Sequence, residues 1–325
     1  MHVHANPDRA LLPPAAPSVL DLIGQTRLVQ LGSIVPEGCA RILLKVESAN
    51  PTGSMKDRMA LAMITAAERT GRLRPGQRVV EYTGGSTGVS LALVAASRGY
   101  SLSIVTSDAF SAEKRAHMAA LGAELTIVPS SGGGMDAALT QAMIATAREI
   151  AVRTGAFWTD QLNNADQLGA YHAMGDEILR QTGGRIDAFV QATGTAASLR
   201  GVAEALRRQA PAIRIVAVEP AESAVLSGGP SGTHRIEGVG AGFVVPLWQD
   251  GIADEIIPVA TDDAMAMARR LAREEALFAG TSTGANLVAA IDVGRRLGPG
   301  ATVVSVLCDT GIKYLSTPLY RAAGA

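Results

Sequence analysis

The chain has 325 residues, roughly enough for two domains, and 47% of them are apolar whereas only 18% are charged. This composition excludes a disordered tail and a small disulfide-stapled protein. The 29 Lys and Arg residues and the 30 Asp and Glu residues leave a net charge of −1, so no strong field attracts nucleic acid or an anionic membrane. Any anion that the protein binds must therefore be held by local groups.

The two cysteines, Cys39 and Cys308, are far apart in the sequence and lack the CxxC spacing of a zinc site. We predict that both are buried apolar residues in a reducing compartment. The N-terminal region has neither the basic start nor the apolar stretch of a signal peptide, and no long apolar run predicts a transmembrane helix. We therefore expect a cytoplasmic protein that binds neither nucleic acid nor a membrane.

Short β-branched runs alternate with Ala-rich runs of helical period in the first half of the chain. The predicted strands and helices, in chain order, are 41–46, 59–70, 78–82, 89–98, 102–106, 112–121 and 125–128. Each predicted helix is closed by a glycine, as helix C-termini commonly are. The order β-α-β-α-β-α-β predicts one parallel sheet, made of these four strands, with helices on both faces.

The alternation resumes in the second half of the chain, where the predicted strands are 188–192, 214–219, 255–259 and 302–307. We therefore predict an α/β protein with two open, twisted, mostly parallel sheets and helices on both faces. The expected parts are an N-terminal segment, 1–40, packed on the C-terminal domain, a smaller domain, 41–154, and a larger domain, 155–325. Ligands of such sheets bind beyond the carboxyl ends of the strands, so the turns there are candidate sites.

Three turns place Gly, Ser and Thr where a helix is expected to begin. They are Thr83-Gly84-Gly85-Ser86-Thr87-Gly88, Thr193-Gly194-Thr195-Ala196-Ala197-Ser198 and Gly280-Thr281-Ser282-Thr283-Gly284. Free N–H groups and hydroxyls at a helix N-terminus bind anions. Ser and Thr are also ordinary N-caps and Gly is common in turns, so a single loop of this kind favours a structural role. The three loops together predict a ligand with several anionic or polar ends.

A lysine follows the first predicted strand, in the segment Ser48 to Arg58 (SANPTGSMKDR). Its Asn-Pro and Thr-Gly-Ser sequences predict a tight turn. Lys56 is expected at the mouth of the next helix, where the helix dipole disfavours its positive charge. An amine kept neutral near pH 7 is a nucleophile that can form a Schiff base with an aldehyde. Lysines on helices are common at protein surfaces, so Lys56 alone would be a weak candidate for this nucleophile. The loop that surrounds it makes it a stronger one.

The segment NPTGSMKDR, residues 50–58, closely resembles the corresponding segment of cysteine synthases, or O-acetylserine sulfhydrylases. These belong to the fold-type II pyridoxal-phosphate enzymes, as does cystathionine β-synthase. The resemblance continues in order from IGQTRL at 23–28 to LCDTG at 307–311 and YLST at 314–317, and so covers nearly the whole chain. It implies a fold like that of the tryptophan synthase β subunit, pyridoxal 5′-phosphate as cofactor, an amino-acid substrate and a homodimer.

The resemblance also implies roles for individual residues, without any metal. Lys56 is the catalytic residue and forms the Schiff base with the cofactor. The other implied cofactor-binding residues contact its phenolic oxygen, its phosphate or its pyridine nitrogen: Ser86 for the oxygen, Gly194, Thr195, Ala196, Ala197 and Ser198 for the phosphate, and Ser282 for the nitrogen. The implied substrate-binding residues hold the carboxylate or line the entrance: Thr83, Gly84, Gly85, Thr87, Gln161 and Gly238.

The type of residue at the pyridine nitrogen indicates the chemistry. A serine hydroxyl cannot keep that nitrogen protonated as a carboxylate would, so a long-lived carbanion is disfavoured and elimination at Cβ is favoured. Lys56 can remove the α-proton once the amino acid has replaced it on the cofactor. The predicted reaction is β-replacement on an O-activated L-serine through an aminoacrylate, with cysteine synthase as the leading form. One alternative is β-replacement with an amine or another nucleophile, as in diaminopropionate synthases. The other alternative is a lyase that eliminates the β-group without replacing it.

The sequence departs from the family where the amino acid and the phosphate are held. The family's Asn and Ser in the carboxylate loop are Ser86 and Gly84 here, and Gly84 is expected to leave space for a bulkier amino acid. Two glycines of the phosphate loop are Ala196 and Ala197, whose backbone is expected to avoid positive φ.

Two other classes of protein stay open. The sequences at 84–88 and 280–284 both fit the G-x-S-x-G nucleophile elbow of a hydrolase. Ser86 could use His117, His172 or His234 as its base, whereas no histidine follows Ser282. The other class is a scaffold that retains the fold without turnover. Neither would show the violet absorption of a lysine-bound pyridoxal phosphate.

Overall fold

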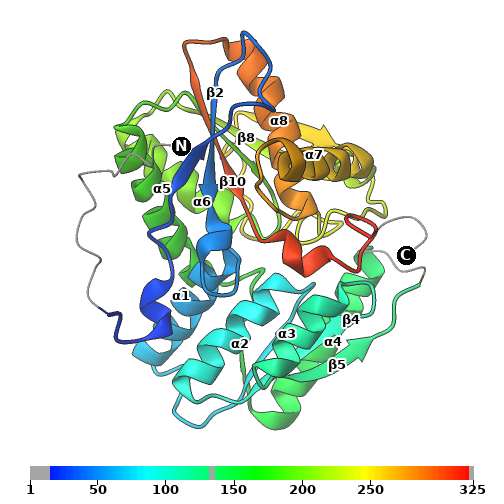
Figure 1. The fold of residues 1–325 in the computed structure, drawn as a ribbon. Coiled ribbons are helices and arrows are strands. Elements are labelled where there is room, and N and C mark those ends of the chain that lie inside the picture. Colours follow the sequence, from blue (N-terminus) through cyan, green and yellow to red (C-terminus); the bar gives the residue numbers. More distant parts are fainter. Residues whose placement is uncertain (1–14, 132–135, 322–325) are drawn as a thin grey trace, which may run out of the picture.

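The computed structural model describes residues 15–131 and 136–321, which form two sheets with helices packed around them (Figure 1). The larger sheet contains β1 (Leu28–Gln30), β2 (Arg41–Val46), β7 (Ala188–Ala192), β8 (Arg214–Pro220), β9 (Glu255–Val259) and β10 (Thr302–Leu307). The smaller sheet contains β3 (Val79–Tyr82), β4 (Leu102–Ser107), β5 (Glu124–Val128) and β6 (Phe157–Trp158).

The strand order is β1-β2-β10-β7-β8-β9 in the larger sheet and β5-β4-β3-β6 in the smaller one. Every neighbouring pair is parallel except β1 with β2. All residues of the central strands β4, β7 and β10 are buried, which explains why their sequences lack the polar–apolar alternation of a half-exposed strand. The predicted α/β class with two mostly parallel sheets is confirmed.

One predicted strand lies in a different sheet from the expected one. The sequence places 41–46 beside β3, β4 and β5, but β2 pairs with β10 in the larger sheet, with Arg41 opposite Thr302 and Val46 opposite Leu307. The short strand β6 pairs with β3 in the smaller sheet instead. A buried parallel strand has the same apolar pattern in any sheet, so the pattern could not select the partner. The expected domain boundaries at residues 41 and 155 stay a prediction.

The segment before β2 contacts both halves of the molecule. Residues Val19–Leu22 pack near helix α2 (Ser86–Arg98) beside the smaller sheet. The residues that follow lie on the larger sheet, where the N–H of Leu31 donates to the carbonyl of Ile42 and that of Ala40 to Gly294. This segment therefore bridges the two sheets along one side of the molecule.

Eight α-helices among the described residues cover the two sheets. They are α1 (Lys56–Arg69), α2 (Ser86–Arg98), α3 (Ala112–Ala120), α4 (Ala137–Thr154), α5 (Leu168–Thr182), α6 (Ala197–Gln209), α7 (Thr261–Glu274) and α8 (Thr281–Leu297). Figure 1 shows α2, α3 and α4 around the smaller sheet and α5 to α8 around the larger one. The start of α1, α2, α6 and α8 falls within the loops that the sequence singled out. No helix in the described ranges is long and apolar enough to cross a membrane.

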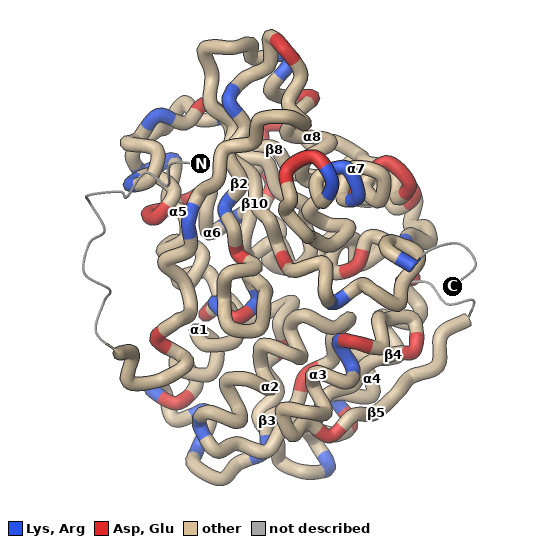
Figure 2. The backbone as a smooth tube through the Cα atoms, in the orientation of Figure 1, with Lys and Arg blue, Asp and Glu red and all other residues tan. Residues whose placement is uncertain are grey.

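Charged residues of both signs are interspersed over the fold (Figure 2). Four of them are buried together between β2, α1 and α5. The guanidinium of Arg58 lies 2.7 Å from Glu47 and 2.8 Å from Glu177, and Lys45 Nζ lies 2.6 Å from Glu177. Two cations thus balance two anions, which is the condition for keeping charges in the interior. The cluster fixes the first turn of α1, two residues after Lys56.

We expect Glu177→Gln to lower the free energy of unfolding by about 3–5 kcal/mol, because it leaves two buried cations with one anion. Burial raises the pKa of Glu177, but hydrogen bonds and charges from Arg58 and Lys45 outweigh burial and bring that pKa to about 2. A depressed pKa stabilises the fold fully above the ordinary value of 4.5, and this contribution is lost as the pH falls toward 2.

Urea unfolding of the wild type and the variant at pH 7 and near pH 3 measures both effects. Glu149→Gln, at a carboxylate that is 74% exposed, is the control and should change little. A Glu177→Gln protein as stable as the control at pH 7 would contradict the expected role of the cluster.

Candidate active site

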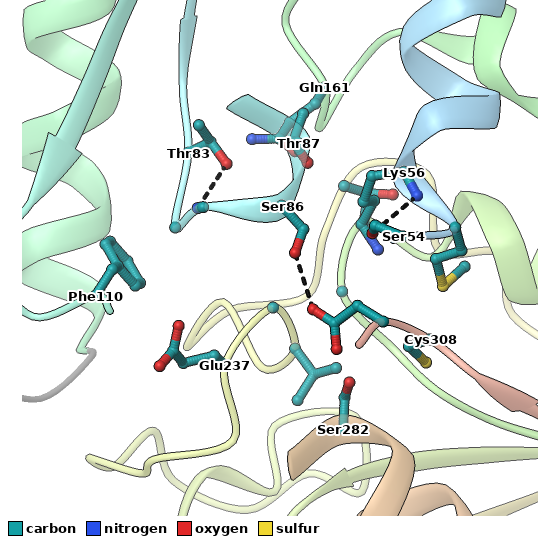
Figure 3. A pocket seen from close by; sticks show the side chains of 18 of the residues that line it. Ser54, Lys56, Thr83, Ser86, Thr87, Phe110, Gln161, Glu237, Ser282 and Cys308 are labelled. Carbon is teal, nitrogen blue, oxygen red and sulfur yellow. Dashed lines mark hydrogen bonds between the residues drawn. The ribbon is translucent and has the colours of Figure 1, made fainter. Parts of the chain in front are cut away.

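A pocket lies at the carboxyl ends of strands from both sheets (Figure 3). Its lining includes Tyr82 at the end of β3, Ala192 at the end of β7 and Cys308 directly after β10. All the predicted site residues line this pocket except Ala196 and Ala197: Ser86, Gly194, Thr195, Ser198 and Ser282 of the cofactor set, Thr83, Gly84, Gly85, Thr87, Gln161 and Gly238 of the substrate set, and Lys56. The structure thus brings together residues from distant loops, while their individual roles stay predictions.

Lys56 is the first residue of α1 and lies in the pocket wall. Burial lowers the pKa of its amine, although the nearby Cys308 and Asp309 oppose the shift. The loop before it is tied to the chain after β10, since the Met55 N–H donates to the Cys308 carbonyl at 2.9 Å and the Thr310 N–H to the Gly53 carbonyl at 2.9 Å. A fixed lysine with a lowered pKa is suited to nucleophilic attack on an aldehyde.

The loop between β3 and α2 is organised by side-chain hydrogen bonds. The Thr83 hydroxyl accepts from the Gly85 N–H at 3.0 Å, and the Thr87 hydroxyl donates to Gln161 Oε1 at 2.9 Å. The Gln161 backbone N–H donates to buried Glu81 at 2.9 Å, so Glu81 positions this glutamine. Burial raises the pKa of Glu81 to about 7, against the lowering effect of its donors. Hydroxyl, amide and backbone donors of this loop are suited to a carboxylate.

The space expected at Gly84 is already filled. A Cβ atom there would lie 2.6 Å from the Phe110 ring, and one at Gly85 would lie 2.3 Å from Lys114 Cδ. Phe110, labelled in Figure 3, precedes α3, and Lys114 belongs to that helix. This helix region therefore packs directly on the backbone of the loop. The expectation that Gly84 admits a bulkier amino acid is therefore wrong. No local sequence signal connects Phe110 to the glycine, since the contact is tertiary.

The loop between β7 and α6 has the geometry of an anion site. Gly194 has no room for a side chain, because a Cβ there would lie 2.4 Å from the Gly238 carbonyl oxygen. Thr195 and Ser198 line the pocket at the start of α6, where the N-cap residue Ala196 makes no side-chain capping bond and the Ala197 N–H donates to the Thr195 hydroxyl at 3.4 Å. The first N–H groups of a helix have no partner within it. These features fit the phosphate of pyridoxal phosphate.

Ala196 departs from its expected backbone conformation. Its φ of +67° is left-handed, whereas the sequence analysis expected both alanines to avoid positive φ. The chain must turn here to present N–H groups at the start of α6, and an alanine adopts this conformation at a cost of roughly 1–2 kcal/mol. Such strain is commonly stored at binding sites.

Ser282 and Cys308 lie at the larger-sheet side of the pocket. Ser282 is the second residue of α8 and is buried, as the predicted contact with a ring nitrogen requires. Both cysteines are buried and free, as predicted. Burial raises the pKa of the Cys308 thiol to about 11, so the thiol stays protonated. Cys308 therefore acts as a small packing residue beside Ser282.

Three charged residues of the pocket were missed by the sequence analysis: Lys114, Glu237 and Asp309. Asp309 lies in the LCDTG motif and Glu237 directly precedes Gly238, so both could have been identified from neighbouring residues that resemble the family. No feature of the sequence around Lys114 indicates that it lies in the pocket. The Ser86 hydroxyl donates to Asp309 at 2.9 Å, as the dashed line in Figure 3 shows. No histidine lines the pocket in the described part of the chain, which removes the hydrolase elbow with His117, His172 or His234 as base.

Comparison with known proteins agrees with this geometry. Residues 19–309 match the model of the family described as pyridoxal-phosphate dependent enzyme. The chain belongs to this family. The cofactor of this enzyme is therefore pyridoxal phosphate, which excludes the scaffold alternative and confirms the fold-type II assignment.

Curated relatives and solved structures cover nearly the whole chain of this pyridoxal-phosphate enzyme. A cysteine synthase of Staphylococcus aureus is 43% identical over 93% of this chain and 96% of its own, and a probable cysteine synthase of Bacillus subtilis is 39% identical over 92% and 96%. The structure of cysteine synthase from Entamoeba histolytica has a TM-score of 0.88 at 34% identity, and the match covers 100% of this chain and 96% of that one. An O-ureido-L-serine synthase structure has a TM-score of 0.88 at 36% identity, and the match covers 96% of this chain and 98% of that one.

We expect Gly84→Ser to lower kcat/KM for the amino-acid substrate at least tenfold, about 1.4 kcal/mol, because its Cβ displaces Phe110 or the loop. The double variant with Phe110→Ala should recover most of this loss, because the ring is the obstacle. Steady-state kinetics of both variants test the expectation. Gly169→Ser, at a glycine with open space around it, is the control. Equal losses in the single and the double variant would contradict the packing argument.

Proposed function

We propose that this enzyme catalyses β-replacement on an O-activated L-serine, with cysteine formation from O-acetylserine and sulfide as the leading reaction. The observation that carries the proposal is the single pocket in which Lys56, the carboxylate loop with Gln161, and the phosphate loop meet. Relatives named cysteine synthase that match more than nine-tenths of the chain support it. The enzyme would then belong to amino-acid biosynthesis.

Each part of the pocket has a task in this reaction. Pyridoxal phosphate, when bound, supplies an electron sink that acidifies the α-proton of the amino acid and permits the β-group to leave. Lys56 would anchor the cofactor and afterwards accept the α-proton at Nζ, where burial lowers the pKa of the amine. Thr83, Thr87 and Gln161 would orient the substrate carboxylate, so that the α-proton faces the lysine.

Ser282 would control how strongly the cofactor ring withdraws electrons. Its neutral hydroxyl lies in the pocket at the start of α8, where the helix dipole disfavours an additional positive charge. A neutral hydroxyl at this place, instead of a carboxylate, would leave the bound cofactor a weaker electron sink, which would suit elimination at Cβ. This supports elimination followed by addition and agrees with the proposed replacement.

A replacement with a nucleophile other than sulfide is the second candidate. The structural similarity to an O-ureido-L-serine synthase at 36% identity favours it, since that protein's name describes a serine derivative without a thiol. The first half of the reaction and the residues named above would be the same. The candidates therefore differ in how the second substrate is held.

We also propose that the enzyme is a cytoplasmic homodimer. Two free, buried cysteines are typical of a reducing compartment, which supports the location. The dimer rests on the resemblance to cysteine synthases. Sedimentation of the purified protein measures directly whether it is a dimer.

We expect Lys56→Ala to abolish the violet absorption of the lysine-bound cofactor and to lower turnover at least 10³-fold, about 4 kcal/mol in barrier, because the general base is lost. Visible spectra and cysteine formation from O-acetylserine and sulfide measure both effects. Lys56→Arg is the matched control: it retains the positive charge but should be equally inactive, because a guanidinium does not form the Schiff base. Full activity of either variant would remove Lys56 from the mechanism.

The wild-type enzyme tests the reaction class itself. If O-activated serines give no replacement product with any nucleophile, while serine or threonine gives a keto acid, the enzyme is a lyase. Formation of cysteine, or of another β-substituted alanine, is the expected result.

A further inference from the structure

The pocket contains three charged side chains besides Lys56 to which the proposed reaction assigns no task. Lys114 comes from α3, Glu237 from the chain between β8 and β9, and Asp309 from the chain after β10. Charges inside a pocket are costly unless they are paired or used by a ligand. The contacts of each side chain indicate which of the three can reach a substrate.

Lys114 is fully engaged by protein groups. Its Nζ lies 2.7 Å from Glu237 Oε2 and 4.0 Å from the centroid of the Tyr314 ring, and its side chain is only 2% exposed. Its stem packs against Gly85. The ammonium therefore compensates Glu237 and does not offer a free charge to a substrate.

Asp309 is also enclosed. Its Oδ2 accepts hydrogen bonds from the Ser86 hydroxyl at 2.9 Å and from the Tyr314 hydroxyl at 2.8 Å. Its Oδ1 is buried against the backbone at Gly280, where a Cβ would lie 2.6 Å away, and has no hydrogen-bond partner among the described residues. The residue is 4% exposed, so this carboxylate positions Ser86 and Tyr314 rather than a second substrate.

Glu237 is the carboxylate that stays accessible, with 13% of its side chain exposed. Its own loop is held in place, since its N–H donates to Thr281 Oγ1 at 3.2 Å and the His234 ring bonds the Gly240 carbonyl at 2.9 Å. Figure 3 shows Glu237 on the opposite side of the pocket from Lys56. A substrate anchored at the lysine would therefore face Glu237, and the neighbouring pocket residue Gly238 is exposed, so this side of the pocket reaches the surface.

The environment of Glu237 makes it a base. Burial raises the pKa of its carboxyl and the charge of Asp309 adds to this, whereas Lys114 opposes the shift and favours the ionised form. Tyr314, which faces the same group from the segment after β10, has a pKa raised well above its usual value and stays neutral. An ionised carboxylate with raised basicity accepts protons more readily than an exposed one does.

We propose that Glu237 is a proton acceptor for the second substrate and gives the enzyme a further activity, β-replacement with a neutral N–H nucleophile. The inference rests on the proposed function. The Cβ–O bond would break in the first half of the reaction, in which the activating group leaves as its anion and Lys56 Nζ holds the α-proton. As the nitrogen then forms its bond to Cβ, the N–H proton would pass to the Glu237 carboxylate and on to solvent, and Lys56 would return its proton to Cα. Hydrosulfide has already lost a proton and needs no such acceptor, so Glu237 serves amines and not sulfide.

Competition between two nucleophiles tests the proposal. The holoenzyme is given O-acetylserine with sulfide and a weakly basic amine, O-methylhydroxylamine, and both β-substituted alanines are quantified. The wild type should form both products, and Glu237→Gln should lower the ratio of amine product to cysteine at least tenfold. Glu113→Gln is the matched control, since its carboxylate joins α3 to Ser316 outside the pocket, and it should retain the wild-type ratio.

A pH profile separates a base from a structural residue. For the wild type, kcat/KM calculated for the unprotonated amine should rise with pH as Glu237 ionises, above the ordinary carboxyl pKa of 4.5, and this rise should be absent from Glu237→Gln. Cysteine formation without any amine product, or an equal loss of both products in the variant, overturns the inference and leaves the proposed function intact. Absence of both products in the wild type overturns the proposed function itself.

Discussion

The parallel pairing of β2 with β10 is the constraint on which the active site depends. Because the strands run in the same direction, the lysine loop after β2 and the Cys308–Thr310 segment after β10 leave the sheet at the same edge. Backbone hydrogen bonds then join the two segments just before Lys56, from the Met55 N–H to Cys308 and from the Thr310 N–H to Gly53. The helix that follows the lysine continues toward the smaller sheet, which supplies the opposite wall of the pocket.

Two groups of buried charges support this arrangement in different ways. Around Arg58 every charge is compensated, and the cluster anchors the helix that carries Lys56. In the pocket, Lys114 joins α3 of the smaller sheet to Glu237 of the larger half, and Asp309 holds Ser86. The first group stabilises the fold, because breaking it would leave a buried charge unpaired. The second group leaves one carboxylate partly accessible, which is a property of a site rather than of a core.

Close packing explains where the interpretation of the loops was wrong. The glycine at position 84 was interpreted as space for substrate, but the Phe110 ring occupies that space. The alanine at position 196 was expected to avoid a left-handed backbone, but it adopts one to begin α6. In both cases the residue type was interpreted by its intrinsic preference, whereas a neighbour distant in sequence or the course of the loop decided the conformation. Loops at a binding site are where such exceptions are concentrated.

The sequence by itself determined eight of the ten described strands, the α/β class and the lysine loop, because apolar period and turn residues are local properties. It also indicated the helices α1, α2, α3, α6 and α8, but not α4, α5, α7 or the short strands β1 and β6. It also indicated the family through segments such as NPTGSMKDR, since a resemblance needs only residue order. Only the tertiary structure decided that β2 belongs to the larger sheet, that Phe110 covers Gly84, and that Lys114, Glu237 and Asp309 meet in the pocket. These are contacts between residues far apart in the chain, and no local pattern specifies the partner of a buried strand or a buried charge.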